Sequence, residues 1–192
     1  MGRAVSSYPS ASHTARPTTF RRKKATKLDN LFEYVSPMKA LSLWQPWASL
    51  MAAGVKIHET RHWSTTYRGP VAIHAAKRID LAGAPEELCA AALGRNWDRL
   101  VPIGMVMAVG RLAACKDARS VASSGLTSAD AAAGNFTRGR FAWRFEELRP
   151  LSRPIPINGR QGLFNWTPPE DLEAGLRPPI DHREACRVIG WS

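Results

Sequence analysis

Apolar residues come in short runs between residues 38 and 166, and their spacing predicts strands alternating with short helices. Runs of apolar and β-branched positions predict strands at four places, over residues 40–43, 71–75, 105–113 and 140–148. Residues 47–53 predict a helix, because Pro46 suits a first helical turn and Gly54 a helix end. Residues 85–93 predict a second helix.

Strands separated by short helices, with no repeating βαβ unit, predict the α+β fold class. We expect a small mixed β-barrel with short flanking helices. Residues 117–139 are rich in Ser, Ala and Gly, so they predict a loop with one helical turn at most. Residues 55–61 are expected to be extended, and residues 159–166 to close the domain.

Composition divides the chain into three parts. Residues 1–37 are rich in Ser, Thr, Pro and Ala and carry a basic cluster at 21–24 without a periodic apolar face, which predicts a disordered basic extension. Whether this extension belongs to the native product stays open, because Met38 opens the first segment with an ordered pattern. Residues 38–167 form the predicted domain, and residues 168–192 a surface tail without an assigned function.

The positive charge is concentrated in the predicted domain. The chain has 27 Lys and Arg against 16 Asp and Glu, a net charge of +11. The net charge is +8 in residues 38–167, +5 in the N-terminal extension and −2 in the tail. Such a field attracts polyanions and favours RNA or DNA as a partner, although a basic surface also simply aids solubility.

Several functional classes find no support in the sequence. The longest apolar run, 105–115, is shorter than the roughly 18 residues of a membrane span, and no secretory signal opens the chain. The three cysteines lie far apart and give neither a disulfide framework nor zinc-ligand spacing. We therefore expect a cytoplasmic protein without a metal, a cofactor, a membrane association or an obligate protein partner.

Charged and aromatic side chains crowd residues 44–63. Lys56, Glu59 and Arg61 lie close in sequence to three tryptophans, Trp44, Trp47 and Trp63. On an ideal strand Glu59 and Arg61 share a face, and a turn after Gly54 would bring Lys56 to the same side. Aromatic rings stack on bases, cations contact phosphates, and a carboxylate accepts a cytosine amino proton. An ordinary ion pair beside core tryptophans is the alternative interpretation.

Four motifs in this order resemble the ASCH domain family over residues 38–167. Residues 54–61, GVKIHETR, match the pattern GxKxxExR, and LWQPWA at 43–48, YRGPVAIHA at 67–75 and GRQGLFNW at 159–166 fit the same family. The resemblance implies a PUA-like β-barrel whose cleft contains the signature and binds RNA or modified nucleic acid. It adds Arg68 and His74 to the candidate binding residues. A satisfied strand histidine is the alternative interpretation of His74.

The resemblance also implies a possible activity, since some members remove the acyl group from N4-acetylcytidine and others are reported as nucleases. The hydrolases are expected to use a lysine, a threonine three residues later and a remote glutamate. Lys56 matches, but Glu59 stands at the threonine position and Thr60 follows it on the opposite strand face. The only acid between Asp117 and Glu146 is Asp130. A related branch with the same Lys-x-x-Glu-Thr-Arg order is also linked to this hydrolysis.

Two functions therefore remain as expectations. The first is a binding module that recognises RNA, DNA or a modified nucleoside in a basic cleft through seven residues: Trp44, Lys56, Glu59, Arg61, Trp63, Arg68 and His74. The alternative is an amidohydrolase acting on N4-acetylcytidine-type nucleosides through Lys56, Glu59 and Thr60. In that reaction Lys56 would shuttle a proton and Glu59 would activate water.

Overall fold

Two long strands, β4 (Met105–Asp117) and β5 (Phe141–Pro156), form the centre of the structure. The computed structural model describes residues 37–191. Its six-stranded mixed sheet has the order β2-β5-β4-β3-β1-β6, and the remaining strands are β1 (Met38–Gln45), β2 (His58–Arg61), β3 (Gly69–Ile79) and β6 (Leu163–Trp166).

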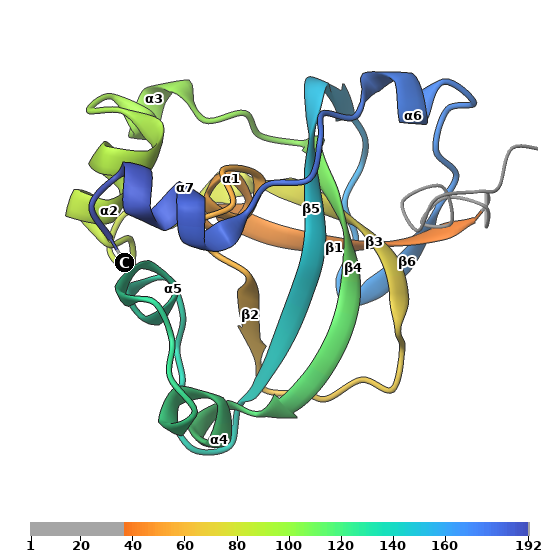
Figure 1. Ribbon diagram of the computed structural model, residues 1–192. Coiled ribbons are helices and arrows are strands. Elements are labelled where there is room, and N and C mark those ends of the chain that lie inside the picture. The colour runs from red at the N-terminus through yellow and green to blue at the C-terminus, as the bar shows by residue number, and fades with distance from the viewer. Residues whose placement is uncertain (1–36, 192) are drawn as a thin grey trace, which may run out of the picture.

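Within residues 37–191, seven short helices connect and flank these strands. They are α1 (Trp47–Ala52), α2 (Glu86–Leu93), α3 (Trp97–Leu100), α4 (Ala118–Ser123), α5 (Ser128–Ala132), α6 (Leu172–Gly175) and α7 (His182–Val188). Figure 1 shows α2, α3, α5 and α7 gathered on one side of the sheet, whereas α6 lies apart at its other end.

Strand pairing brings distant parts of the signature region together. The first strand, β1, runs parallel to β3 and pairs Ser42 with His74. At the other edge, β2 runs antiparallel to β5 and pairs His58 with Arg144. The principal core fills the concave side of the sheet, and its largest members, Trp143, Phe145 and Leu41, are almost completely buried. This core fixes the strands that carry the candidate site.

The α+β class, the mixed sheet and the short helices are confirmed. All four expected strands are present and end beyond their expected last residues, and both expected helices form. Within residues 37–191 the edge strands β2 and β6 do not pair with each other, so closure into a barrel is not confirmed. Two helices, α4 and α5, occupy the expected loop at 117–139. Each begins at an N-cap whose side chain accepts a backbone hydrogen bond, Asp117 for α4 and Thr127 for α5.

The C-terminal segment packs more closely than a surface tail would. Leu172 and Leu176 of the α6 region join the cluster around Phe164 and Trp166, and Cys186 of α7 is fully buried against Val55. The N-terminal extension, apart from its last residue, lies outside the described residues. No helix between residues 37 and 191 has the length and apolar character needed to cross a membrane.

Candidate functional site

The predicted signature residues line a cavity of about 470 Å³. Its wall comes from β1, α1, the segment 56–62 and the connection between α5 and β5. A cavity of this size lies within the usual range for small-molecule sites. Its charged and aromatic lining includes Trp44, Trp47, Lys56, Glu59, Arg61, Asp80 and Arg140.

Lys56 is a buried ammonium with three oxygen neighbours. Its side chain is 1% exposed, and Nζ donates to the carbonyl oxygens of His58 and of Ala133, the latter at 2.7 Å. The third neighbour is the Glu59 Oε2 atom at 3.4 Å. Since an ammonium has three N–H donors, these contacts satisfy the group and make its burial tolerable.

Glu59 lies between two cations. Its Oε2 atom faces Lys56, and its Oε1 atom lies 3.0 Å from Nε of Arg61, oriented as an ion pair rather than as a hydrogen bond. The Arg61 guanidinium also donates from Nη2 to the Ser42 carbonyl oxygen at 2.8 Å. These contacts fix the carboxylate at the cavity wall, where it is a preorganised hydrogen-bond acceptor.

A tight turn after α1 brings Lys56 to the side of Glu59. Gly54 has φ +76°, a left-handed conformation that favours glycine, and Val55 and Lys56 both direct their backbone N–H groups to the Leu50 carbonyl. Ile180 covers the turn so closely that a Cβ at Gly54 would lie 2.3 Å from its Cγ2. The turn expected from the sequence is therefore present.

Asp130 of α5 binds the signature segment on the side away from the cavity. Its Oδ1 accepts hydrogen bonds from the backbone N–H groups of Ile57 (2.9 Å) and His58 (3.0 Å), and its Oδ2 contacts Nδ1 of His58. Burial raises the pKa of this carboxyl, but the hydrogen bond and charge of His58 and the charge of Lys56 outweigh that effect and hold its pKa below the ordinary value. Asp130 is therefore a structural anchor and does not line the cavity.

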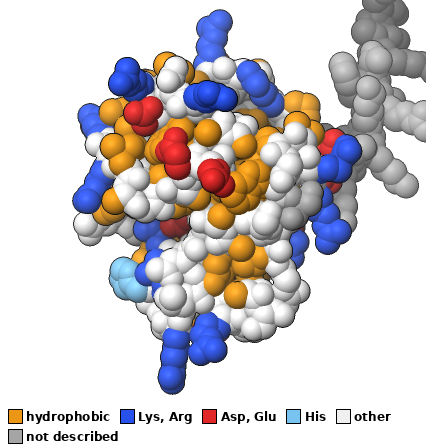
Figure 2. Space-filling view, turned by 90° about the vertical axis from the view of Figure 1, so that its left-hand side faces the viewer, with side chains coloured by type: hydrophobic (Ala, Val, Ile, Leu, Met, Phe, Trp, Pro, Cys, Tyr) orange, Lys and Arg blue, Asp and Glu red, His pale blue; other side chains and the backbone are white. Residues whose placement is uncertain are grey.

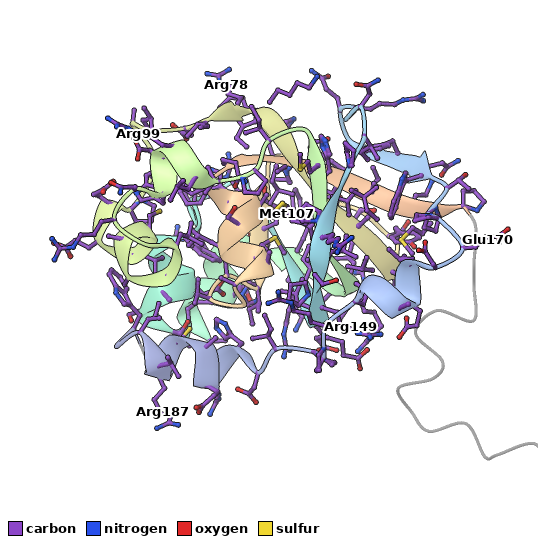
Figure 3. The ribbon with its side chains drawn as sticks, turned by 90° about the horizontal axis from the view of Figure 1, so that it is seen from above. Arg78, Arg99, Met107, Arg149, Glu170 and Arg187 are labelled. Atoms are coloured by element: carbon purple, nitrogen blue, oxygen red, sulfur yellow. The ribbon has the colours of Figure 1, made fainter. Side chains whose placement is uncertain are left out.

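The tryptophans divide between the site and the core. Trp44 lines the cavity, is 43% exposed, and has the Arg78 guanidinium 3.7 Å from its ring centroid. Arg78 projects from the edge of the molecule in Figure 3. Trp63, a predicted binding residue, instead packs edge-to-face on Trp143 with ring centroids 4.4 Å apart, and it does not line the cavity.

The other predicted residues take different positions. Thr60 lines the cavity, but its Oγ1 already accepts a hydrogen bond from the Asn135 backbone at 3.0 Å. Arg68 is exposed in the turn before β3, where it donates to the Thr65 and Tyr67 carbonyls, and it is not in the cavity wall.

His74 lies one layer behind the cavity. Its Nδ1 is 3.0 Å from Oγ of Ser42, whose carbonyl binds Arg61, and burial lowers the pKa of the imidazole. Its Nε2 is buried without a hydrogen-bond partner in the described structure. Gly159 covers the ring so closely that a Cβ there would lie 2.3 Å from Cε1. His74 is therefore not in the cavity wall, and it contacts the lining residue Ser42.

Five polar residues of the cavity lining were not predicted from the sequence: Ser42, His62, Asp80, Asn135 and Arg140. Arg140 donates to the Thr60 carbonyl at 2.8 Å and joins the cavity through the fold alone, since 80 residues separate the two in sequence. No local motif marks such a contact. Among residues 37–191, no group of three or more His, Cys, Asp and Glu side chains is placed to hold a metal ion.

Comparisons with known proteins agree with the motifs. The model of the ASCH domain family matches residues 41–150. A crystal structure of ASCH from Zymomonas mobilis is 15% identical, covers 71% of this chain and 91% of its own, and has a TM-score of 0.42. A mutant of that protein is also 15% identical, with coverages of 80% and 96% and a TM-score of 0.40. A search of curated proteins gives no match.

Proposed function

The chain belongs to the ASCH domain family, which is PUA-like, and on this premise we propose that its signature cavity binds an unpaired base of a nucleic acid or the corresponding free nucleoside. The observation that carries the proposal is the position of the Glu59 carboxylate, held between Lys56 and Arg61 at the wall of a cavity of about 470 Å³. Such an acceptor suits the exocyclic amino group of cytosine.

The aromatic residues of the cavity complement this acceptor. The Trp44 ring lines the cavity and is 43% exposed, and the Arg78 guanidinium over one of its faces offers a cation for a phosphate, which leaves the other face for a base to stack on. A base that enters the cavity would therefore find a stacking plane at the mouth and a fixed carboxylate inside. Both are features of single-stranded recognition, in which bases are splayed out and read on their edges.

The contacts of Lys56 favour binding over hydrolysis. Its Nζ donates to two backbone carbonyls and forms an ion pair with Glu59, so the lysine side chain is already fixed by protein groups. Thr60 is also engaged, because Asn135 donates to its hydroxyl oxygen. Deacylation of N4-acetylcytidine stays the alternative, with Glu59 as the group that would activate water at the amide carbon.

Calorimetric titration of the purified chain with cytidine and with uridine tests the proposal. We expect cytidine to bind about tenfold more tightly, because uridine offers a carbonyl where cytosine offers the amino group, a difference worth about 1–3 kcal/mol. Glu59→Gln should abolish this preference, whereas the matched exposed variant Glu170→Gln should keep it. Equal affinities for both nucleosides in the wild type would contradict base recognition by Glu59.

An activity assay on the same protein preparation distinguishes binding from the alternative function, hydrolysis. Incubation with N4-acetylcytidine and chromatography of the products measures release of cytidine. Binding without release supports the binding module, whereas turnover that disappears in Lys56→Met would favour the amidohydrolase.

A further inference from the structure

A second and larger concavity lies on the other side of strand β2. Its volume is about 990 Å³, and it is bordered by β2, β4, β5, the α4–α5 region and α7. It shares Ile57 and His58 with the signature segment but none of the residues that line the signature cavity. We call it the basic groove, defined by Lys116, Arg144, Arg183 and Arg187 together with His58.

Strand register sets the floor of the basic groove. His58 of β2 pairs with Arg144 of β5, which in turn pairs with Ala114 of β4, so these three lie in one row across the sheet. Lys116 and Ala142 form the adjacent row. Paired residues present their side chains on the same face about 5 Å apart. Because both rows contain an alanine, the floor stays open between the cationic side chains.

Helix α7 forms one wall. Arg183 and Arg187 are four residues apart and therefore lie on one side of the helix. His182 holds the helix against the turn after α1 and the start of α5, since its ring nitrogens lie 2.7 Å from the Gly54 carbonyl oxygen and 3.1 Å from the Thr127 hydroxyl oxygen. In Figure 3, Arg187 and Arg78 project from opposite sides of the molecule, so this groove is remote from the Trp44 stacking surface.

Positive charge exceeds negative charge in the lining. Lys116 and Arg183 are exposed and have no ion-pair partner among the described residues, whereas Arg144 and Arg187 lie beside Glu146 and Glu184. The lining contains two acids. Asp130 is paired with His58, and Asp181 caps α7 by accepting a hydrogen bond from the Glu184 backbone N–H. Figure 2 shows Lys and Arg side chains around the edge of the face on which α2, α3, α5 and α7 lie.

One imidazole in this groove is held in a fixed orientation. Asp130 fixes the His58 ring through Nδ1, and Nε2 of the ring has no hydrogen-bond partner in the described part of the chain. An anchored imidazole between Arg144 and α7 adds a directed polar contact to the surrounding cations. The cations come from two strands and one helix, which suits several phosphates in succession rather than one compact anion.

We propose that the basic groove binds the sugar–phosphate backbone of a nucleic-acid strand, as a second site distinct from the signature cavity. The dominant contacts are salt-sensitive pairs of Lys116, Arg144 and Arg183 with phosphates. RNA and DNA share this chemistry, so the backbone contact does not depend on the sugar. Base recognition in the signature cavity and backbone binding in the groove are separable properties of the chain.

Charge reversal in the groove tests this assignment. Fluorescence anisotropy with labelled 20-nucleotide single-stranded RNA and DNA, over a salt series, compares the wild type with Lys116→Glu/Arg183→Glu. We expect at least a tenfold loss of affinity for both probes at about 100 mM salt. The slope of log affinity against log salt should become shallower by about 1.4, since each phosphate contact of a single strand contributes about 0.7.

The control is Arg99→Glu/Arg153→Glu, which changes the net charge equally at exposed positions outside both cavities. It should keep oligonucleotide affinity within about threefold of the wild type. Equal losses in both double variants would overturn the site and leave only a global charge effect. If polyglutamate binds as tightly as the oligonucleotides and loses as much affinity in the Lys116→Glu/Arg183→Glu variant, the assignment to nucleic acid would be overturned.

Cytidine titration distinguishes failure of this inference from failure of the proposed function. The groove variant should bind cytidine as the wild type does, because its substitutions lie outside the signature cavity. If Glu59→Gln alone loses cytidine binding and the groove variant binds oligonucleotides as the wild type does, the proposal for the groove alone would be overturned. If the wild type binds no cytidine but the groove variant still loses affinity for oligonucleotides, the proposed function alone would be overturned.

Discussion

At the scale of single residues, the site depends on buried polar groups whose partners come from distant parts of the chain. Lys56, Glu59 and Arg61 form a row of alternating charge, and the ends of that row are held by carbonyl oxygens of Ala133 and Ser42. A buried charge is stable only when such partners are present. The packing of neighbouring loops is therefore as important as the signature itself.

Gly159 illustrates this dependence. We expect Gly159→Ala to lower the free energy of unfolding by about 1–3 kcal/mol, because the new Cβ would overlap the His74 ring and the Ser42 hydroxyl. Urea denaturation measures the change. Gly175→Ala is the matched control, since a Cβ there would meet only Leu151 at 3.7 Å. Equal stability of the two variants would show that the loop 159–162 does not press on His74.

His74 should also make stability depend on pH. Burial lowers the pKa of its imidazole below the ordinary 6.5, so the unfolded chain takes up a proton before the folded chain does. The contribution of His74 is complete above pH 6.5 and is lost as the pH falls through the folded pKa. Denaturation at a series of pH values from about 7.5 to 5 should show a smaller loss in His74→Gln than in the wild type.

The exposed His62 supplies the control for that series. His62→Gln should follow the wild-type curve, because it removes an exposed imidazole and leaves the buried His74 in place. A His74→Gln curve parallel to that of the wild type would contradict the lowered pKa.

At the scale of elements, strand β2 contributes residues to both sites. Glu59 and Arg61 face the signature cavity, whereas His58 faces the basic groove. Helix α5 holds this short edge strand through Asp130, whose carboxylate binds the backbone at Ile57 and His58. A substitution of Asp130 should therefore change the affinity for a nucleoside, although Asp130 does not contact the nucleoside.

Two substitutions at position 130 test that coupling. Asp130→Ala should lower the free energy of unfolding by about 3 kcal/mol or more and weaken cytidine binding, because buried donors lose their acceptor. Asp130→Asn keeps an oxygen for the two backbone N–H groups and should restore much of both properties. Urea denaturation and cytidine titration measure the two effects, and an Asp130→Ala protein with wild-type cytidine affinity would contradict a positioning role.

Much of the element order could be predicted from the chain, because apolar runs and glycine or proline boundaries are local signals. The shared face of Glu59 and Arg61 and the turn at Gly54 follow from the same local geometry. The three short helices in 118–132 and 182–188 were missed, since their stability comes from caps and from buried partners such as Cys186. Trp63 could not be assigned either, because its packing on Trp143 depends on the sheet order.

At the scale of the whole molecule, the signature cavity and the basic groove are placed on different sides. Arg78 and Trp44 lie at the signature cavity, and Arg183 and Arg187 lie across the molecule at the groove. A strand long enough to reach both sites would place an unpaired base in the cavity and the backbone of a more distant part of the strand in the basic groove. The overall charge of +11 then increases the rate of encounter, whereas the cavity determines which base is held.

The seven tryptophans give the most direct measurement of the central claim, that the signature cavity binds a nucleoside. In a ¹⁵N-tryptophan-labelled protein, each indole N–H gives one NMR signal, and Trp44→Phe identifies the signal of Trp44. On titration with cytidine we predict a saturable shift of the Trp44 signal, with the core signals of Trp97 and Trp143 unchanged because both rings are buried away from the cavity. A saturable shift that leaves the Trp44 signal unchanged, or no shift at any cytidine concentration, would contradict the account.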